Sequence, residues 1–241
     1  MDTCEVADRE GTGGLAQAAS GTRAAQEESA ALYERYRPKT WGEVVGQDKA
    51  IAKIRLAGGQ GFGGLAFWLS GPTGIGKTTI ARLIAAEIAS PWAITEMDAQ
   101  DLSLPELREI EDGMDYYGLG KGGKAYIVNE AHGLRDDVIR RLLTVLEHRT
   151  SHVVWVFTTT RTGQERLFAD HDDAAPLLSR CCVINLTNQG CADAFGQRAR
   201  EIATAENLNG QPAAAYRRLA QDCHNNFREM LQRIGMGEMA G

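Results

Sequence analysis

The chain has 241 residues, of which 43% are hydrophobic and 24% are charged, and its formal net charge is −6 at pH 7. This composition is that of an ordinary globular protein, and no apolar run approaches the ~20 residues that a membrane-spanning helix needs. The negative net charge argues against wholesale coating of nucleic acid, although it leaves room for a small basic surface.

The first 30 residues are rich in Gly, Ala, Ser and Thr and show no apolar periodicity, so we expect residues 1–30 to form a flexible arm. They contain no apolar stretch of the secretory type, which favours a cytoplasmic location. The five cysteines form no C-x-x-C pair, so neither a zinc site nor a disulfide framework is expected.

Between residues 31 and 187, short apolar runs alternate with helical patterns. This alternation is typical of parallel strands joined by crossover helices, so we predict an α/β core with helices on both faces of a parallel sheet. The predicted strands are Leu65–Leu69, Ala93–Met97, Ala125–Val128, Val153–Phe157 and Cys182–Leu186. A polar insertion, residues 161–174, separates the last two strands.

Residues Gly71–Thr78 form a complete G-x-x-x-x-G-K-[ST] phosphate-binding loop between a predicted strand and an amphipathic helical stretch. Its glycines let backbone N–H groups surround a β-phosphate. Lys77 can reach the β- and γ-phosphates, and Thr78 can ligate Mg²⁺. We therefore predict that the chain binds ATP and Mg²⁺. The predicted contacts are Gly71, Pro72, Thr73, Gly74, Ile75, Gly76, Lys77, Thr78 and Thr79.

Two polar residues follow the predicted strand Ala125–Val128, at the edge where parallel sheets bind ligands. The first, Asn129, stands where an aspartate normally orders a water on Mg²⁺, and the second, Glu130, is predicted to polarise the attacking water. Asn129 can still hold a metal-bound water through its oxygen. The missing charge predicts weaker Mg²⁺ affinity and slower turnover, and on charge alone Asn129→Asp is expected to raise both.

From about residue 188 the strand patterns stop. Three helical patterns follow, at Ala192–Glu206, Pro212–Asp222 and Asn225–Ile234. Their apolar residues recur at helical spacing, and Asn225 is a plausible helix cap. We predict that residues 188–241 form a small C-terminal helical domain.

A series of motifs in matching order and spacing resembles the AAA+ ATPases. Within them it resembles clamp-loader ATPase subunits of the bacterial γ/τ or replication factor C small-subunit type. The motifs are Tyr33–Trp41 with Val44–Gln47, the phosphate loop, Asn129–His132, Phe157–Thr160, Pro176–Cys181 and Asn226–Leu231. The resemblance implies a P-loop AAA+ core over residues 31–187, with a parallel five-stranded sheet flanked by helices. Residues 188–241 would be the lid.

The resemblance also implies roles for single residues. Thr160, at the sensor 1 strand end, would orient the hydrolytic water. Arg180 would be the arginine finger for a neighbour's ATP, and Arg228 would contact the γ-phosphate from the lid. Arg108, on the predicted helix Leu104–Asp112, would face DNA phosphates. The residues expected around the adenine are Tyr36, Arg37, Pro38, Val44 and Val45.

Three features depart from that family pattern. Asn129 replaces the usual aspartate. The four-cysteine zinc module of the γ/τ type has no counterpart, because Ala89–Trp92 runs straight into the next predicted strand. The printed sequence ends at Gly241, where clamp-loader subunits continue into a helical collar. Either the collar is absent or assembly rests on the ATPase interfaces alone.

The resemblance implies an ATP-hydrolysing subunit of a clamp-loader-like complex, acting on DNA with a sliding clamp and other clamp-loader subunits in a homo- or hetero-oligomer. Two alternatives stay open: a nucleotide-gated scaffold with weak hydrolysis, and a related AAA+ ATPase of DNA repair or recombination. A small P-loop kinase is a further alternative, but it would have no use for an arginine acting between subunits. No membrane partner is expected.

Overall fold

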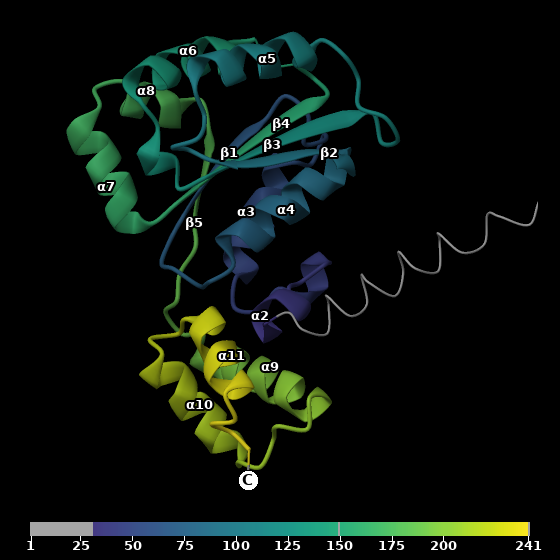
Figure 1. Ribbon diagram of the computed structural model, residues 1–241, viewed down its shortest axis with the longest axis vertical. Coiled ribbons are helices and arrows are strands. Elements are labelled where there is room, and N and C mark those ends of the chain that lie inside the picture. Colours follow the sequence, from purple (N-terminus) through teal and green to yellow (C-terminus); the bar gives the residue numbers. More distant parts are fainter. Residues whose placement is uncertain (1–30, 149, 241) are drawn as a thin grey trace, which may run out of the picture.

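The computed structural model describes residues 31–148 and 150–240, so the predicted arm over residues 1–30 lies outside the described residues. A sheet with helices on both faces forms the upper part of the molecule, and a group of helices forms the lower part (Figure 1). Within the described residues, no helix is long and apolar enough to cross a membrane.

The sheet has five parallel strands in the order β2-β3-β4-β1-β5, which confirms the predicted core. The strands are β1 (Ala66–Ser70), β2 (Ala89–Asp98), β3 (Gly123–Asn129), β4 (Val153–Thr159) and β5 (Cys182–Asn185). The chain order reverses around β1, so the loop that follows β1 lies at the switch point where open parallel sheets bind ligands.

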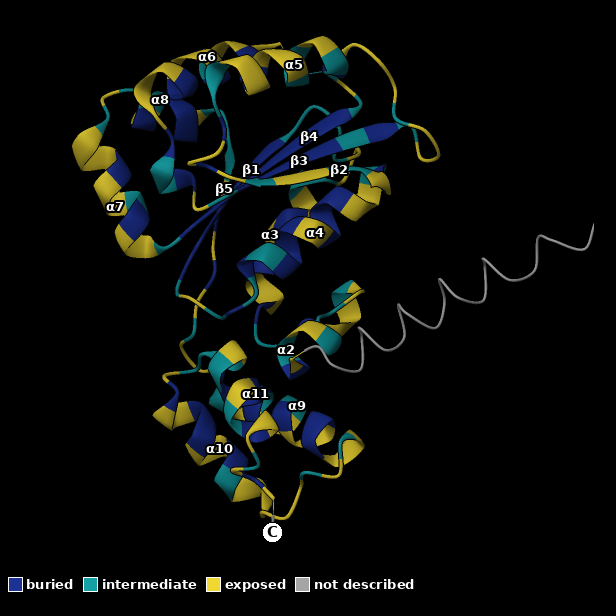
Figure 2. Cartoon of the chain, in the orientation of Figure 1, coloured by how far each residue is buried: buried dark blue, intermediate teal, exposed yellow. Residues whose placement is uncertain are grey.

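Each central strand is buried on both faces, as the continuous apolar runs predict (Figure 2). Phe67 and Leu69 join one apolar cluster with helices α3 and α4, whereas Trp68 joins another with α5, α6, α7 and α8. These helices are α3 (Asp48–Ala57), α4 (Lys77–Ile88), α5 (Leu104–Met114), α6 (Asp136–Glu147), α7 (Arg161–Asp170) and α8 (Ala174–Ser179). Two 3₁₀ turns, η1 (Trp41–Glu43) and η2 (Ala131–Gly133), complete this part.

Two elements differ from the sequence expectation. The edge strand β2 begins at Ala89 rather than Ala93, with an irregular register between Ala89 and Ile94. Pro91 falls in that irregular stretch, and an edge strand tolerates its missing N–H. The sequence predicts no element in the polar insertion after β4, but most of it forms α7.

The C-terminal helices α9 (Ala192–Ala205), α10 (Ala213–Asp222) and α11 (Phe227–Gly235) enclose a third apolar cluster. Leu32, from the short helix α2 (Leu32–Arg35), belongs to this cluster although the rest of the cluster lies far along the chain. Asn226 begins α11 by accepting a hydrogen bond from the Glu229 amide through its side chain. The segment that precedes the core therefore packs against the C-terminal helices and brings residues 33–45 beside them (Figure 1).

Candidate functional site

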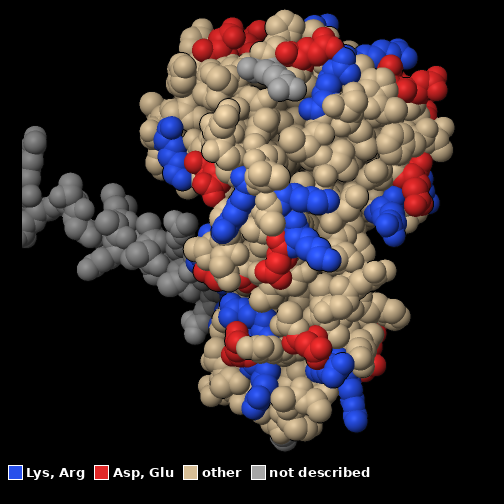
Figure 3. Space-filling model, turned by 180° about the vertical axis from the view of Figure 1, so that it is seen from behind, with Lys and Arg blue, Asp and Glu red and all other residues tan. Residues whose placement is uncertain are grey.

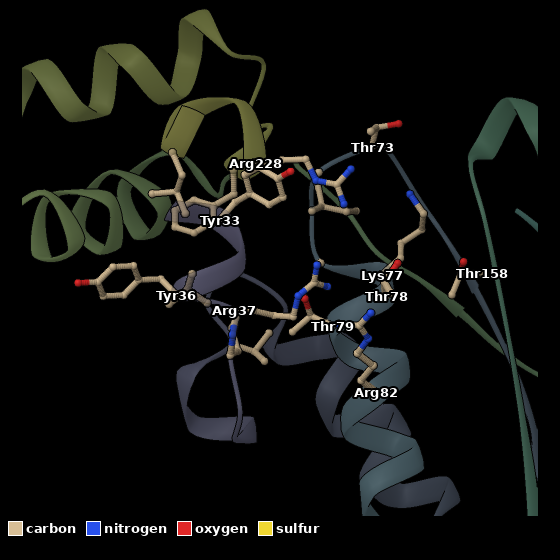
Figure 4. A pocket seen from close by; sticks show the side chains of 18 of the residues that line it. Tyr33, Tyr36, Arg37, Thr73, Lys77, Thr78, Thr79, Arg82, Thr158 and Arg228 are labelled. Atoms are coloured by element: carbon tan, nitrogen blue, oxygen red, sulfur yellow. The ribbon is translucent and has the colours of Figure 1, made fainter. Parts of the chain in front are cut away.

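A cavity of about 370 Å³ lies where the carboxyl ends of the strands meet the C-terminal helices. It is lined by residues 73–79, by the ends of β2, β3 and β4, by residues 33–45 and by side chains of α9 and α11. Its size is within the ~300–1,000 Å³ typical of small-molecule sites. Figure 4 shows labelled side chains from residues 33–37, the phosphate loop, α4, β4 and α11 around one space.

The phosphate loop has the backbone that an anion cradle requires. Gly74 and Gly76 have φ values of 75° and 100°, a left-handed conformation that favours glycine. Gly76 immediately precedes α4, which begins at Lys77, so the helix N-terminus points its free N–H groups at the cavity. A Cβ at Gly74 would lie 1.7 Å from Asn226 Oδ1, so the lid contacts the loop closely at this point.

Lys77 is the buried cation of the cavity, with 8% of its surface exposed. Its Nζ donates hydrogen bonds to the carbonyl oxygens of Gly71 and Pro72, at 3.0 and 2.8 Å. Burial lowers the pKa of Lys77; Glu130 acts in the opposite direction and Arg228 in the same one. Lys77, Glu130 and Arg228 all line the cavity, so the phosphate loop, the end of β3 and the lid converge on one place.

Asn129 connects the loop to the ends of two strands. Its Oδ1 accepts hydrogen bonds from the hydroxyls of Thr158 and Thr78, at 2.9 and 3.4 Å, and its Nδ2 donates to Glu96 Oε1 at 2.8 Å. Hydroxyl and amide oxygens are hard ligands of the kind that Mg²⁺ prefers. Thr78 and Asn129 therefore fit a Mg²⁺ ion held together with nucleotide phosphates.

Glu130 stands at the end of β3 with φ 49° and ψ 47°. A non-glycine residue in this conformation is uncommon, and such strain is found preferentially at functional sites. Its carboxylate lines the cavity and lies 3.4 Å from His132 Nδ1, which in turn lies 3.1 Å from Thr159 Oγ1. Glu130 is therefore a half-exposed carboxylate beside the phosphate loop, in contact with His132.

The structure does not place Thr160 in the cavity. Its hydroxyl accepts a hydrogen bond from the Gly163 amide at 2.9 Å and caps the N-terminus of α7. Thr158, two residues earlier on the same face of β4, lines the cavity instead and is 2% exposed. The chain leaves the sheet at Thr159 and turns into α7. Thr158 is therefore the threonine that lies beside Asn129, to which its hydroxyl donates a hydrogen bond.

Arg228, on α11, lines the cavity. Its guanidinium lies 5.5 Å from the centre of the Tyr33 ring. Tyr36 lines the cavity too, but its hydroxyl donates to Glu206 Oε1 at 2.6 Å and points away from the loop (Figure 4). This hydrogen bond, with burial, raises the pKa of Tyr36. The other predicted adenine contacts, Arg37, Pro38, Val44 and Val45, also line the cavity.

Arg180 lies outside this cavity, between α8 and β5. Its Nη1 donates to the Pro176 carbonyl at 2.9 Å, and its Nη2 contacts Glu147. It borders a small pocket with Gly64 and Val153, at the amino ends of β1 and β4. The sheet therefore separates Arg180 from the chain's own phosphate loop. Arg108 is exposed on α5.

Sequence reasoning missed a pair of charged residues in the cavity, Arg82 and Glu96. Arg82 lies one turn after Thr78 on α4, and its Nε donates to Glu96 Oε2 at 2.7 Å. Burial acts to raise the pKa of Glu96, but hydrogen bonds from Arg82 and Asn129 outweigh it, and the pKa is lowered. The i, i+4 spacing from Thr78 was the available signal for Arg82.

The fold and the cavity together define a P-loop nucleotide-binding ATPase closed by a helical lid. Residues 66–219 match the family model described as "AAA domain (dynein-related subfamily)", so the chain belongs to the AAA family of ATPases. Similar curated proteins include the DNA polymerase III subunit gamma/tau of Mycobacterium bovis, which is 30% identical over 155 residues. That alignment covers 54% of this chain and 27% of the relative.

Two further relatives align over more of the chain. The Haemophilus influenzae DNA polymerase III subunit tau/gamma is 28% identical over 236 residues, covering 86% of this chain and 33% of the relative. The Escherichia coli subunit tau is 26% identical over 225 residues, covering 83% and 33%. This chain thus spans a third or less of these relatives. Among solved structures, a RuvB variant from Thermotoga maritima aligns with a TM-score of 0.63 at 20% identity, covering 83% of this chain and 64% of that one, which supports the fold.

Proposed function

We propose that this chain is an ATP-binding and ATP-hydrolysing AAA+ subunit of a clamp-loader-like complex. The observation that carries the proposal is the convergence of Lys77, Asn129, Glu130 and Arg228 on one cavity between core and lid. The similarity to DNA polymerase III gamma and tau subunits supports a role in DNA replication.

In the proposed reaction, the loop amides and Lys77 bind the phosphates of ATP, while Thr78 and Asn129 hold Mg²⁺. The ion would neutralise charge on the β- and γ-phosphates. Glu130 polarises the attacking water and accepts its proton, and Thr158 takes the role that the sequence assigned to Thr160. Arg228 contacts the γ-phosphate from α11, so loss of that phosphate would loosen the lid from the core.

Arg180 would complete the site of a neighbouring subunit. It lies across the sheet from its own phosphate loop, where it cannot reach its own ATP. An arginine supplied in trans stabilises charge in the transition state. This geometry supports an oligomer, homomeric or heteromeric, in which each active site is built from two chains.

DNA and a sliding clamp are the proposed partners. On the face seen in Figure 3, Lys and Arg are interspersed with Asp and Glu and form no unbroken basic surface. The DNA contact proposed for Arg108 therefore depends on the alignment of several subunits around a channel. The test is ATP turnover by the purified chain with and without primed DNA and the organism's own clamp. Stimulation by both together is expected, and its absence would contradict the clamp-loader role.

Asn129 favours one second candidate, a scaffold subunit that binds ATP to hold a complex together and hydrolyses it poorly. The two functions differ in a single measurement. A scaffold binds ATP as tightly as a motor does, but its turnover stays at background even when its partners are present.

A further inference from the structure

The side chain of Asn129 has one end that donates hydrogen bonds and one that accepts them, and the two ends have nearly the same shape. Its oxygen must face Thr78 if it is to serve a metal ion, because an amide nitrogen has no lone pair to offer. Turned the other way round, the same side chain would present N–H groups to the metal position. The orientation of this one amide therefore decides whether the site can hold Mg²⁺.

Glu96 fixes that orientation. A carboxylate can only accept, so the atom of Asn129 that lies 2.8 Å from Glu96 Oε1 has to be the nitrogen. The oxygen is then left for the hydroxyls of Thr78 and Thr158, both of which donate to it. All three hydrogen bonds agree with one orientation, and the flipped amide would set two oxygen atoms against each other.

Glu96 is itself held in place. On the sheet it lies opposite Ile127, two residues before Asn129, so both side chains stand on the face of the sheet that α4 covers. Arg82 of α4 donates to its second oxygen at 2.7 Å. One carboxylate oxygen thus binds the helix that carries Thr78, and the other binds the end of β3.

We propose that Glu96 is a positioning residue of the metal site, which turns the oxygen of Asn129 toward Thr78 and so makes an asparagine usable there. The inference rests on the proposed function, since it assumes that Mg²⁺ and nucleotide bind in this cavity. The proposal assigns Glu96 no direct contact with Mg²⁺ or with the nucleotide.

The proposal reverses the expectation for Asn129→Asp. An aspartate has no N–H to donate, so its carboxylate would meet the carboxylate of Glu96 where a hydrogen bond of 2.8 Å now lies. The charge gained for the metal is offset by this repulsion. Asn129→Asp alone should therefore bind Mg²⁺ no better than the wild type, and the combination with Glu96→Gln should bind it better than Asn129→Asp alone.

The experiment measures the affinity for a non-hydrolysable ATP analogue by calorimetry, once with Mg²⁺ and once with EDTA, and takes the ratio as the gain due to Mg²⁺. In the wild-type background, Glu96→Gln should lower this ratio about tenfold, as changes behind a metal ligand commonly do. In the Asn129→Asp background the same substitution should raise the ratio. Only a group acting through residue 129 gives effects of opposite sign.

Glu111→Gln is the matched control. Glu111 also pairs with a helix arginine, Arg141, at 2.7 Å, and the exposed side-chain fractions are similar, 19% for Glu111 and 26% for Glu96. Glu111 lies outside the cavity, so Glu111→Gln should show the same ratio of affinities with Mg²⁺ and with EDTA as the wild type. Melting temperatures show whether each variant is folded.

An equal loss in both backgrounds would overturn the proposal, because Glu96 would then act only through Arg82 or the fold. An unchanged ratio for Glu96→Gln would overturn it too. If Glu96→Gln does not fold, Asn129→Asp decides, since a clear rise in its ratio contradicts the proposed contact. Failure of the wild type to bind nucleotide under either condition would instead overturn the proposed function, and this inference with it.

Discussion

Lys77 offers the sharpest test of nucleotide binding, through the substitution Lys77→Met. Methionine keeps an unbranched apolar stem of similar length and removes only the charge and its hydrogen bonds. Because Lys77 is 8% exposed, solvent screens its interaction with a bound phosphate only weakly. A hydrogen bond to a charged group contributes about 1.5–3 kcal/mol. The expected loss of ATP affinity is therefore about 10- to 150-fold.

Calorimetric titration of ATP measures this loss directly, and Lys121→Met is the control. Lys121 Nζ donates to the Ala86 carbonyl near the other end of α4, at 2.5 Å, so the control also removes a lysine bound to a backbone oxygen. Lys121 lies outside the cavity, and its loss should leave ATP affinity unchanged. If Lys77→Met binds ATP within about threefold of the wild type, the phosphate-loop interpretation is wrong.

Three further outcomes follow from the placement of single residues. Thr158→Val should lower kcat, whereas Thr160→Val should leave kcat unchanged and lower the free energy of unfolding by about 1 kcal/mol, because it removes the cap of α7. Urea unfolding and kinetics together therefore separate the two threonines. Arg180→Ala should lose about 10³-fold or more in turnover while binding ATP normally, and mixing it with Glu130→Gln should restore part of the rate; no restoration contradicts a finger acting in trans. Burial raises the pKa of Cys181 to about 12, so at pH 8 only about 10⁻⁴ of this thiol is ionised and iodoacetamide should label it slowly until the chain is unfolded; rapid labelling in the native state contradicts this.

The sheet could be predicted because its central strands are continuous apolar runs, which the fold buries on both faces. The phosphate loop could be predicted because its chemistry is local, contained in eight consecutive residues. Helix α7 could not, since its composition is polar and its main buried apolar residue is Leu167. The formation of α7 depends on the cap at Thr160 and on packing against η2 and α8. These packing partners cannot be recognised from the residues of α7 alone.

The two threonines at the end of β4 show a different limit. Alternation along a strand puts Thr158 and Thr160 on the same face, so periodicity cannot choose between them. The choice depends on where the strand ends, and element boundaries are what sequence patterns define least well. Once α7 begins at Arg161, the hydroxyl of Thr160 is used by the helix, and only Thr158 is left for the cavity.

The effect of Asn129 on the metal site depends on residues outside its own motif. Considered alone, Asn129 is a neutral residue at a position where an aspartate is usual, and the missing negative charge is expected to weaken Mg²⁺ binding. The fold brings Glu96 from the neighbouring strand and Arg82 from α4 to the same place, and a carboxylate beside position 129 changes what that position needs. An amide can donate to Glu96 and still accept from Thr78, whereas an aspartate could do only the second. The identity of residue 129 is thus coupled to that of residue 96, and the effect of either residue on Mg²⁺ affinity depends on the other.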